Sequence, residues 1–583
     1  MENLDVSRAL TLLADLLEIQ GANPFRIRAY RNAVNTVNGL SRSLDSMVAA
    51  GEDLTELPGI GKNVAAHIRE LLESGTIDRL SEVEAEIPRS LVELMDLDGV
   101  GPKKARKLYD ELAIRSITDL EEALGTGAVA SLEGFGTRSA DKIRRAIEDH
   151  RKHAGRFRID EAEKLIAGLL DHVRAAPGVT RVEIAGSLRR RRDTIGDVDL
   201  LAECDGDGAS VVEHFVAFGG SARAEAAGPT KGSVVLHSGL QVDLRVVPSS
   251  SFGAALVYFT GSKDHSVAIR TLAVRRSLRV NEWGVFRAGG EEVGPESSDR
   301  VAGSTEEEVY AALGLAWVPP VLRENRGEIE RAASGSLPRL VELADVRGDL
   351  QMHSTWSDGR ASLADMARAC AERGYEYMAV TDHTQAMAMV GGLTPARARM
   401  QWEEIDAVRA RLPEIDILKS AEVDILRDGD LDLPDEILEG LDVVVVSVHS
   451  FMDQDVTTMT DRVLRAIAHP EVDILAHPTG RRINRREPFA LDVEAVLQAA
   501  AELSVAVELN ANPDRLDLND VHIHRAKELG VPVVLSTDAH HPKGLADMRF
   551  GVDQARRGWL EPFDVLNTRS RDELRQWLAR RAS

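Results

Sequence analysis

The sequence lacks the features that would mark several classes of protein. Only two of its 583 residues are cysteines, Cys204 and Cys370, which excludes a disulfide framework and a cysteine-rich zinc finger. No segment reaches the roughly 18 consecutive apolar residues that span a bilayer. The N-terminal segment MENLDVSRALTLLADLLEIQ has no basic start and no small-residue cleavage site, so we expect no signal peptide, no membrane partner and a cytoplasmic location.

An excess of positive charge is also missing. The chain has 95 acidic and 71 basic residues and a formal net charge of −24, which argues against indiscriminate binding to nucleic acid. A local basic cleft remains compatible with this total. Hydrophobic residues make up 43% of the chain, enough for sizeable cores, and the length corresponds to about four domains.

The hydrophobic pattern changes twice along the chain. Residues 1–155 form amphipathic helical runs separated by Gly-x-Gly turns, whereas short β-rich runs bounded by Gly, Asp and Ser begin at Arg181. The prolines and the Gly-Ser patch between Trp317 and Val346 predict a connector with a short helix. Beyond Val346, apolar strand candidates alternate with helical stretches, which is typical of a β/α barrel.

Three segments of the helical region share one design, an apolar residue followed by Gly-x-Gly and a helix. They read LPGIGKNVAAHIREL, LDGVGPKKARKLYDEL and LEGFGTRSADKIRRAIE. Backbone N–H groups in such turns can hold a phosphate at a helix N-terminus; the alternative is a helical repeat that only packs against itself. The segments resemble helix-hairpin-helix motifs, which implies contacts with DNA phosphates without sequence readout. The glycines concerned are Gly59, Gly61, Gly99, Gly101, Gly134 and Gly136.

Acidic residues of the β-rich region form a candidate metal site. Asp197 and Asp199 stand on one predicted strand, on the same face and about 7 Å apart along it, and Asp243 stands on another. Three carboxylates around two Mg²⁺ ions suit phosphoryl transfer, because the metals stabilise the attacking and leaving oxygens. Gly186 and Ser187 precede them at a predicted strand-to-helix turn, and this combination makes the signal specific.

This assembly resembles the nucleotidyltransferase core of the family X DNA polymerases, which include DNA polymerase beta. The hairpin motifs before it and YFTGSKDHSVAIR after it carry the same resemblance, over about residues 1–317. The resemblance implies that Asp197 and Asp199 bind both metals. It also implies that Asp243 binds the catalytic metal and activates the primer 3′-hydroxyl.

The resemblance further implies the residues that hold nucleotide and template. Tyr258 and Phe259 would crowd a ribose 2′-hydroxyl, and Arg270 would contact the template. Two positions depart from the family. Ser266 replaces an asparagine that touches the incoming base, and His67 replaces a Schiff-base lysine, so deoxyribose-phosphate lyase activity is not expected. The residues implied to hold the triphosphate are Ser187, Arg190, Gly196 and Arg158.

After the connector, segments rich in histidine and acids close the strand-like runs. In a β/α barrel their side chains would converge at one rim, where imidazole and carboxylate suit Zn²⁺, Mn²⁺ or Fe²⁺. Their order resembles a PHP domain, named for polymerases and histidinol phosphatases, over about residues 346–583. Gln351 replaces a usual histidine, so one metal is expected to bind weakly or to be absent. The implied ligands are His353, Asp358, His383, Glu422, His449, His477, Asp538 and His540.

The expected fold is multidomain α/β, with a helical helix-hairpin-helix region, an α+β nucleotidyltransferase palm and thumb, and a C-terminal distorted β/α barrel. Each boundary follows a change of pattern or the family resemblance. The expected domains are a helical DNA-binding domain at 1–88, a fingers-like domain at 89–155, the palm at 156–250, the thumb at 251–317, a linker at 318–345 and the PHP domain at 346–583.

The expected function is gap filling in DNA repair by two-metal nucleotidyl transfer with Mg²⁺ or Mn²⁺. The PHP domain would act as a 3′–5′ exonuclease, with cleavage at abasic sites left open. The expected partners are gapped or primer-template DNA and deoxynucleoside triphosphates, and we expect a monomer. One alternative keeps the polymerase and makes the barrel a silent structural or DNA-binding platform, because of Gln351. A more distant one is a non-templated transferase fused to a small-molecule phosphatase, which the three hairpin motifs disfavour.

Overall fold

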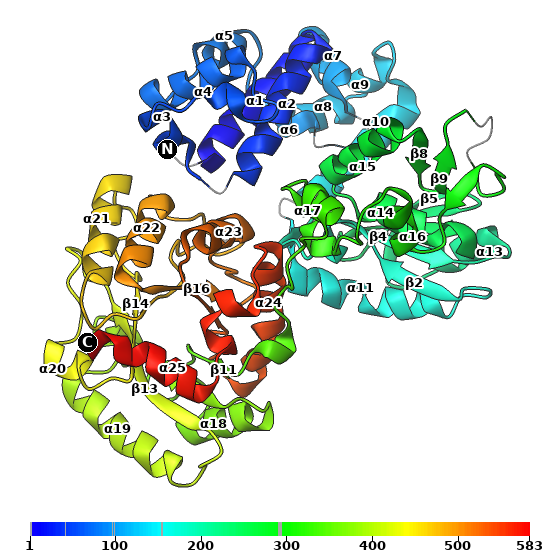
Figure 1. Cartoon of the computed structure of the whole chain (residues 1–583). Coiled ribbons are helices and arrows are strands. Elements are labelled where there is room, and N and C mark those ends of the chain that lie inside the picture. The colour runs from blue at the N-terminus through cyan, green and yellow to red at the C-terminus, as the bar shows by residue number, and fades with distance from the viewer. Residues whose placement is uncertain are drawn as a thin grey trace. The chain divides into compact units, whose positions relative to one another are not determined.

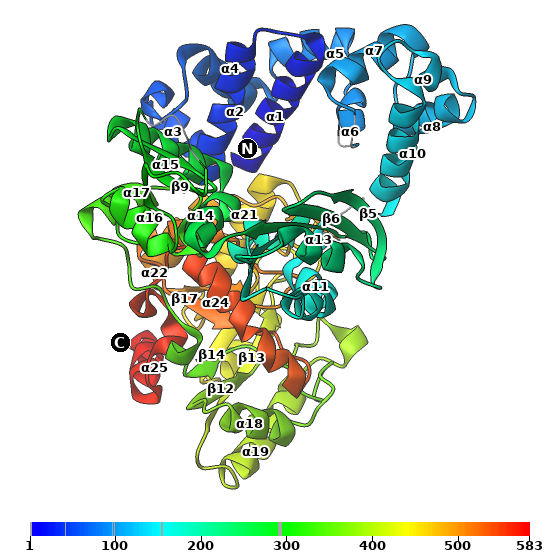
Figure 2. The ribbon, with the colours of Figure 1, turned by 90° about the vertical axis from the view of Figure 1, so that its right-hand side faces the viewer.

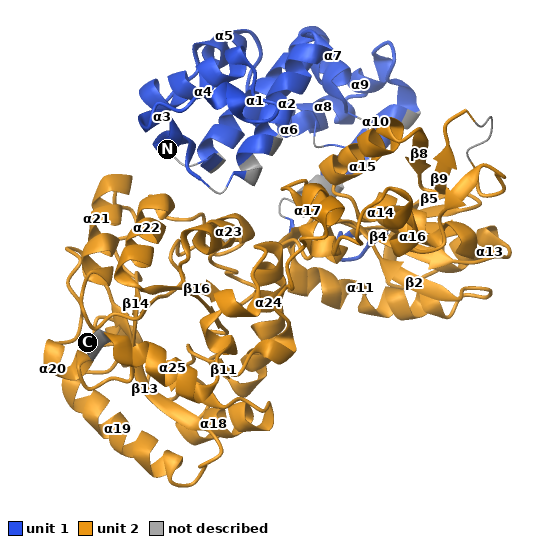
Figure 3. Cartoon of the chain, viewed as in Figure 1, with its two compact units in different colours: residues 1–156, 235–240 blue, residues 157–234, 241–583 orange. Residues whose placement is uncertain are grey.

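The computed structural model describes the chain at residues 3–40, 42–95, 97, 100–152, 156–289, 294–484 and 486–582. It consists of two compact units, coloured separately in Figure 3. Residues 1–156 and 235–240 form the first unit, and residues 157–234 and 241–583 form the second. In the described part of the chain, no helix combines the length and the apolar character that crossing a bilayer requires.

Helices dominate the described residues between 3 and 152 in the first unit, as the amphipathic pattern predicts. In α4 (Lys62–Ser74) the buried residues Val64, Ile68 and Leu71 recur every three or four positions, which is the spacing of one helix face. Gly75 ends this helix in the left-handed conformation, which glycine adopts without a Cβ clash. The other helices are α1 (Asn3–Gln20), α2 (Pro24–Gly39), α3 (Leu44–Ala49), α5 (Asp78–Glu86), α6 (Leu91–Met95), α7 (Pro102–Leu112), α8 (Ile117–Gly125), α9 (Ala128–Ser131) and α10 (Gly136–Lys152).

A five-stranded sheet with the order β2-β4-β7-β6-β5 forms the palm. Its strand β4 pairs antiparallel with β2 and parallel with β7. Helix α13 packs against β7, and α14 packs against β4. Figure 2 shows α13 beside the sheet that carries β5 and β6. The strands are β2 (Arg181–Ile184), β4 (Asp197–Glu203), β5 (Ser221–Ala227), β6 (Lys231–Leu236) and β7 (Gln241–Val247), with α11 (Ile159–Arg174), α12 (Gly186–Arg189) and α13 (Gly208–Val216) between them. The short strands β1 (Phe157–Arg158) and β3 (Thr194–Ile195) pair separately.

The thumb combines helices with a three-stranded antiparallel sheet. It contains α14 (Phe252–Thr260), α15 (Lys263–Arg275), β8 (Leu278–Asn281), β9 (Gly284–Arg287), β10 (Arg300–Ala302) and α16 (Glu306–Ala312). The fully buried His265 imidazole links α15 to α16 and to α17 (Glu328–Ser334), because its ring nitrogens contact Glu328 at 2.6 Å and the Tyr310 hydroxyl at 2.9 Å. Helix α17 is the short helix predicted for the connector.

Seven parallel strands in sequence order form the barrel. Strand β14 carries four successive valines and is entirely buried, as expected for a parallel strand covered on both faces. A parallel bridge between Met352 and Ala539, which follow the first and last strands, brings the two edges together. The strands are β11 (Gly348–Asp349), β12 (Tyr377–Val380), β13 (Asp416–Asp424), β14 (Val443–Ser447), β15 (Ile474–Leu475), β16 (Ala506–Asn510) and β17 (Val533–Ser536).

Helices lie outside these strands, as Figure 1 shows. One exception is α25, whose Leu574 and Leu578 join the core inside the strands. The described helices of the barrel are α18 (Leu363–Glu372), α19 (Pro395–Arg409), α20 (Asp435–Leu438), α21 (Val456–Ile467), α22 (Val493–Leu503), α23 (Asp520–Leu529), α24 (Met548–Arg557) and α25 (Arg571–Leu578). The predicted β/α barrel is confirmed, and its strands end at one rim.

Candidate active sites

The palm sheet brings three carboxylates to one place. Asp197 and Asp199 stand two residues apart on β4, so their side chains share one face of the sheet. The parallel pairing of β4 with β7 sets Asp199 directly opposite Asp243. Gln241, opposite Asp197 in the same register, donates from Nε2 to Oδ1 of Asp243 at 3.3 Å. Strand register therefore assembles the predicted triad.

The cluster is electrostatically short of positive charge. Burial, together with the charges of Asp197 and Asp243, raises the pKa of Asp199 to about 7. Arg245 and Arg190 oppose this shift without cancelling it. A hard divalent cation would relieve the repulsion and keep Asp199 ionised. The donor set therefore fits Mg²⁺ or Mn²⁺.

The turn before the triad allows the backbone to approach it closely. Gly186 has a φ of +62°, and a Cβ atom there would lie 2.3 Å from Oδ2 of Asp199. Only glycine is compatible with both the left-handed backbone and the carboxylate. The hydroxyl of Ser187 is buried and has no hydrogen-bond partner among the described residues. A polar ligand at this turn would satisfy it.

The two arginines implied in triphosphate binding are both held by carboxylates. Arg190 donates from Nε to Glu324 at 3.1 Å and from Nη1 to the carbonyl of Thr260 at 2.5 Å. Its charge also acts on Asp199, so it lies within electrostatic reach of the triad. Arg158 donates to Asp514 of the barrel at 3.1 Å. The structure therefore places Arg190 beside the palm triad, whereas Arg158 pairs with a carboxylate of the barrel.

The remaining palm and thumb candidates lie on exposed or half-buried surface. Gly196 is exposed next to Asp197. Tyr258 is 36% exposed and meets the half-buried Phe259 edge to face, with 5.2 Å between the ring centroids. The Ser266 hydroxyl is buried without a partner among the described residues, and the exposed Arg270 donates from Nε to the Ser266 carbonyl at 3.2 Å.

The predicted hairpin glycines stand at the beginnings of helices. Gly61 and Gly101 are the N-cap residues of α4 and α7, and α10 begins at Gly136. Gly59 and Gly134 adopt positive φ angles of 77° and 86°. These five glycines are exposed, so their backbone N–H groups are open to a ligand. The prediction at Gly99 falls outside the described residues.

His67, where the resemblance implies no lyase, lies in a hollow of the first unit. Its imidazole stacks against Tyr30, and its Nδ1 lies 2.9 Å from the Tyr30 hydroxyl. Arg26, Asn63 and Arg79 line the same cavity, which has a volume of about 610 Å³.

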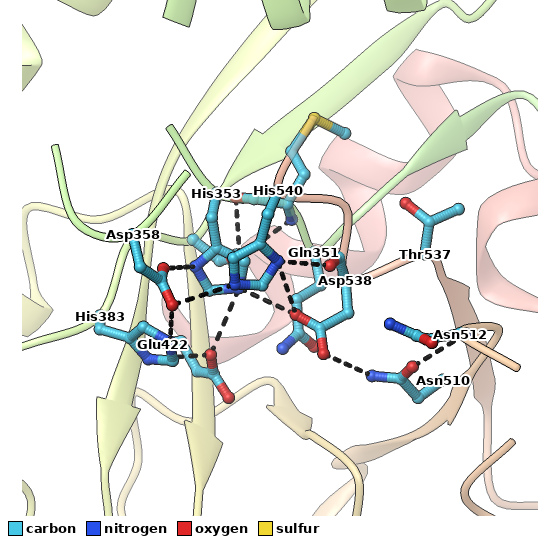
Figure 4. Close-up of polar contacts among 12 residues, drawn as sticks. Gln351, His353, Asp358, His383, Glu422, Asn510, Asn512, Thr537, Asp538 and His540 are labelled. Carbon is cyan, nitrogen blue, oxygen red and sulfur yellow. Dashed lines mark hydrogen bonds and ion pairs between the residues drawn. The ribbon is translucent and has the colours of Figure 1, made fainter. Parts of the chain in front are cut away.

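The predicted barrel ligands converge at the ends of the strands (Figure 4). Glu422 of β13 lies at the centre of the group, with its carboxylate between 2.8 and 3.5 Å from imidazole nitrogens of four histidines. Those histidines are His353, His383, His449 and His477. The cluster thus collects one donor from each of several strand ends.

Acids and histidines of the barrel also form two groups with the spacing of metal ligands. Donor atoms of His353, Asp358, His383 and His540 lie within 4.8 Å of one another, and so do those of His383, Glu422 and His449. Asp538 contacts Nε2 of His353 at 3.0 Å. All eight ligands that the sequence predicts are therefore brought together.

The carboxylates of the barrel cluster raise the pKa values of two of its histidines. Burial disfavours the charged form of His383, but Glu422 and Asp358 outweigh it and raise the pKa of this imidazole to about 9. The pKa of His540 is also about 9, because Asp358 and Asp538 outweigh burial. Metal ions bound at these nitrogens would replace the protons, since a ligating imidazole must be neutral.

Gln351 lies at the same rim, but its side chain, unlike those of the predicted ligands, has no polar partner among the described residues. It is 1% exposed, and neither its amide nitrogen nor its amide oxygen has a hydrogen-bond partner among the described residues. Nδ1 of His353 is equally unpartnered. Buried polar groups without partners are costly, so these orphaned atoms support a bound cation or water here.

Comparison with known proteins identifies each part of the chain. A helix-hairpin-helix domain model matches residues 1–77, and a SAM-like helix-hairpin-helix tandem model matches residues 91–149. The DNA polymerase beta thumb model matches residues 255–324, and the PHP domain model matches residues 349–511. The DNA polymerase/3′-5′ exonuclease PolX of Bacillus subtilis (strain 168) is 39% identical over 582 residues, which cover 100% of both chains.

The chain belongs to the bacterial family X DNA polymerases with a C-terminal PHP domain. DNA polymerase lambda of Rattus norvegicus is 26% identical over 346 residues, which cover 55% of this chain and 56% of the relative. A probable phosphatase of Thermoanaerobacter sp. (strain X514) is 31% identical over 199 residues, covering 32% of this chain and 76% of the relative. The fold and family predicted from the sequence are confirmed.

Sequence reasoning missed several residues around the histidine and carboxylate cluster of this family X polymerase. Asp424 accepts from Nδ1 of His449 at 3.2 Å, which orients the ring. Glu508 and Asn510 end β16, where Asn510 donates to Asp538 at 3.2 Å. Nε of Arg515 lies 3.4 Å from the same carboxylate. The segment VAVELN carries the same strand-end signal as the predicted ligands, but no sequence signal marks Arg515.

Two further buried carboxylates hold the loops that carry the ligands, and of these the sequence suggests such a supporting role, or a helix cap, for Asp382. Asp382 accepts hydrogen bonds from Ser354 and from Gln401, both at or below 2.9 Å, and so fixes the loop of His353. Asp349 accepts from the backbone N–H groups of Gln351 and Thr537. Both carboxylates are fully buried, and their hydrogen bonds fix the loops on which the predicted ligands stand.

Proposed function

We propose that the palm triad catalyses addition of a deoxynucleotide to a primer 3′-hydroxyl in DNA. Asp197 and Asp199 would hold two divalent cations, Mg²⁺ or Mn²⁺, which supply charge stabilisation to the attacking and leaving oxygens when bound. Asp243 would receive the proton of the primer hydroxyl. The observation that carries the proposal is the register of β4 and β7, which sets Asp199 opposite Asp243.

The nucleotide would bind between the turn that follows β2 and the thumb. The buried, unpartnered hydroxyl of Ser187 and the exposed backbone at Gly196 would bind the triphosphate, and Arg190 lies within electrostatic reach of Asp199. Tyr258 and Phe259 would face the sugar. The remaining proposed contacts are Arg158 with the triphosphate, Ser266 with the base, Arg270 with the template, and Gly59, Gly61, Gly99, Gly101, Gly134 and Gly136 with DNA phosphates.

The barrel is proposed to hydrolyse phosphodiester bonds from the 3′ end, the activity named in the Bacillus subtilis relative. The eight predicted ligands would hold Zn²⁺, Mn²⁺ or Fe²⁺, and the ions supply an activated water when bound. Gln351 would offer a carbonyl oxygen in place of imidazole, which is a poorer ligand for zinc-like ions. We therefore propose two well-held ions and one weak position, with hydrolysis retained.

A silent barrel is the second candidate, and Gln351 is the observation that favours it. Against it stands the completeness of the other ligands, since His353, Asp358, His383 and His540 keep donor atoms within 4.8 Å of one another. A barrel kept only as a platform has no need for this spacing. We further propose short-gap filling in repair, by a cytoplasmic monomer, as the setting of both activities.

One gel assay tests both proposals. A 5′-labelled primer in a one-nucleotide gap is incubated with Mn²⁺, with and without deoxynucleoside triphosphates, for the wild type, Asp197→Ala and His540→Ala. We expect extension with nucleotides and shortening without them, each variant losing one behaviour. Extension without shortening in the wild type would support the silent barrel, and an unchanged Asp197→Ala would contradict the proposed polymerase site.

A further inference from the structure

A buried arginine of the barrel reaches the polymerase palm. Arg557, the last residue of α24, has a side chain only 1% exposed. Its Nη1 donates to the Arg190 carbonyl at 2.6 Å and to Glu324 at 3.0 Å, and its Nη2 donates to Asp520 at 2.7 Å. Each terminal nitrogen of the guanidinium is therefore used, and one of its partners is the backbone of a proposed triphosphate ligand.

Glu324 connects the two arginines. Burial alone would raise its pKa, but Arg557, Arg190 and neighbouring arginines lower it to about 2. The carboxylate is thus ionised at neutral pH, and it accepts from Nε of Arg190 at 3.1 Å as well as from Arg557. A buried carboxylate needs such partners, so removing either arginine changes how the other is held.

Arg190 is oriented by these contacts rather than merely neutralised. Nε is bound to Glu324 and Nη1 to the Thr260 carbonyl, whereas Nη2 makes no hydrogen bond to the described residues. A planar guanidinium fixed at two nitrogens has its third nitrogen fixed as well. The backbone N–H of Arg190 donates to the carbonyl of Gly186 at 3.3 Å, and Gly186 lies against the Asp199 carboxylate, which places Arg190 on the turn beside the proposed cations and triphosphate.

We infer that Arg557 is a positioning residue for the polymerase reaction. Through Glu324 and the Arg190 carbonyl, it holds Arg190 with Nη2 available to the incoming triphosphate. This inference rests on the proposed role of Arg190 in nucleotide binding. The barrel then contributes to nucleotide affinity through its fold, independently of whether its metal cluster hydrolyses DNA.

A neighbouring arginine provides a matched control. Arg326 donates from Nη1 to Asp520 at 3.0 Å, the same carboxylate that Arg557 binds. Its side chain makes no hydrogen bond to Arg190 or Glu324 among the described residues, although its charge also helps to lower the pKa of Glu324. Arg326→Gln therefore weakens the same ion-pair group without removing a hydrogen bond on the path from Arg557 through Glu324 to Arg190.

Single-nucleotide gap filling by the full chain tests the inference in wild type, Arg557→Gln, Arg326→Gln, Glu324→Gln and Arg190→Gln. We expect Arg557→Gln to raise KM for the deoxynucleoside triphosphate about tenfold, as for loss of an oriented charge-assisted hydrogen bond. Its kcat and exonuclease rate should stay within about twofold of wild type. Glu324→Gln should give the same pattern, and Arg326→Gln should keep the wild-type KM.

The outcomes distinguish a failure of the positioning role of Arg557 from a failure of the proposed nucleotide-binding role of Arg190. If Arg190→Gln raises KM and Arg557→Gln does not, the positioning role is wrong and the role of Arg190 stands. If neither variant raises KM, the proposed role of Arg190 is wrong and the inference falls with it. Circular dichroism checks folding. If Arg557→Gln does not fold, Arg557→Gln/Asp520→Asn, which removes one buried charge of each sign, replaces it in the same comparison.

Discussion

Asp199 on β4 and Asp243 on β7 lie directly opposite each other on adjacent parallel strands. Because both carboxylates face the same side of the sheet as Asp197, replacing one of them removes a ligand without disturbing the strand. We expect Asp243→Asn to reduce gap-filling turnover on the order of a thousandfold, since several kcal/mol of charge stabilisation are lost. Single-turnover extension measures the effect.

Asp207→Asn is the matched control for Asp243→Asn. Asp207 caps α13 by accepting from the Ala209 N–H at 3.0 Å, and asparagine caps a helix equally well. Gap filling should therefore stay at the wild-type rate. Equal losses in the two variants would indicate general damage to the palm rather than loss of a metal ligand.

Primer extension should require a higher Mg²⁺ concentration as the pH falls. The pKa of Asp199 is raised from 3.8 to about 7, so below pH 7 a cation must displace a proton. The apparent Mg²⁺ affinity should fall about tenfold per pH unit there and level off above it. In the metal-free chain, this raised pKa gives a stability contribution that is present in acid and lost as the pH rises through about 7.

Half-saturating Mg²⁺ concentrations for gap filling at pH 6, 7 and 8 measure this dependence. A flat profile across the range would show that Asp199 is already ionised without metal. Asp207, an exposed acid of the same domain, has no part in the expected profile, so Asp207→Asn should reproduce the wild-type curve.

Loss of His540 should separate the two activities. His540 contacts Asp358 at 3.1 Å and shares a ligand group with His353 and His383. We expect His540→Ala to lower the exonuclease rate at least about a hundredfold, a usual consequence of removing a group that shapes a metal site, while extension is kept. The adjacent His541 only accepts from the Lys543 N–H, so His541→Ala should leave both rates unchanged.

Gln351→His should strengthen the weak metal position. The Gln351 side chain is buried and its amide has no hydrogen-bond partner among the described residues, so an imidazole there replaces no existing contact. We expect about one additional metal ion per chain after dialysis, because imidazole binds zinc-like ions better than an amide oxygen. Elemental analysis of the full chain measures this, and an unchanged metal content would refute the assignment.

The stability of the thumb should depend on the buried carboxylate of Glu328. This carboxylate accepts from His265 at 2.6 Å and from the backbone N–H groups of Asn325 and Arg326. Glu328→Gln should lower local stability by about 2 kcal/mol, since hydrogen bonds to a charged group are weakened. Hydrogen exchange of residues 252–334 reports this, with exposed Glu330→Gln on the same helix as a control that should not change.

Much of the candidate site could be predicted from local pattern. The Asp-x-Asp spacing of Asp197 and Asp199 places both on one face of any strand, since side chains alternate. The Gly-x-Gly turns precede helices wherever they are described. Barrel ligands such as His353 and His449 follow strands, so their convergence at one rim follows from the parallel order. The domain boundaries and residue roles stay predictions.

Other members of the site could not be found in this way. The sequence leaves open whether Asp382 supports a ligand or caps a helix, and only the structure shows that Asp382 and Asp349 are buried among backbone N–H and hydroxyl donors. Arg190 reads as a free phosphate ligand, but two of its nitrogens are already occupied. Such distinctions depend on what surrounds a side chain, which local pattern does not record.

The sequence by itself determined the strands, the turns and the chemical types of the ligands, because these depend on the alternation and spacing of nearby residues. Only the tertiary structure decided which distant residues meet. Strand register brings Asp199 opposite Asp243, and the packing of α24 against the palm brings Arg557 into contact with Arg190. Contacts between residues so far apart in the sequence form because whole helices and strands are buried against one another. A buried charged side chain then pairs with an oppositely charged group that this packing brings close to it.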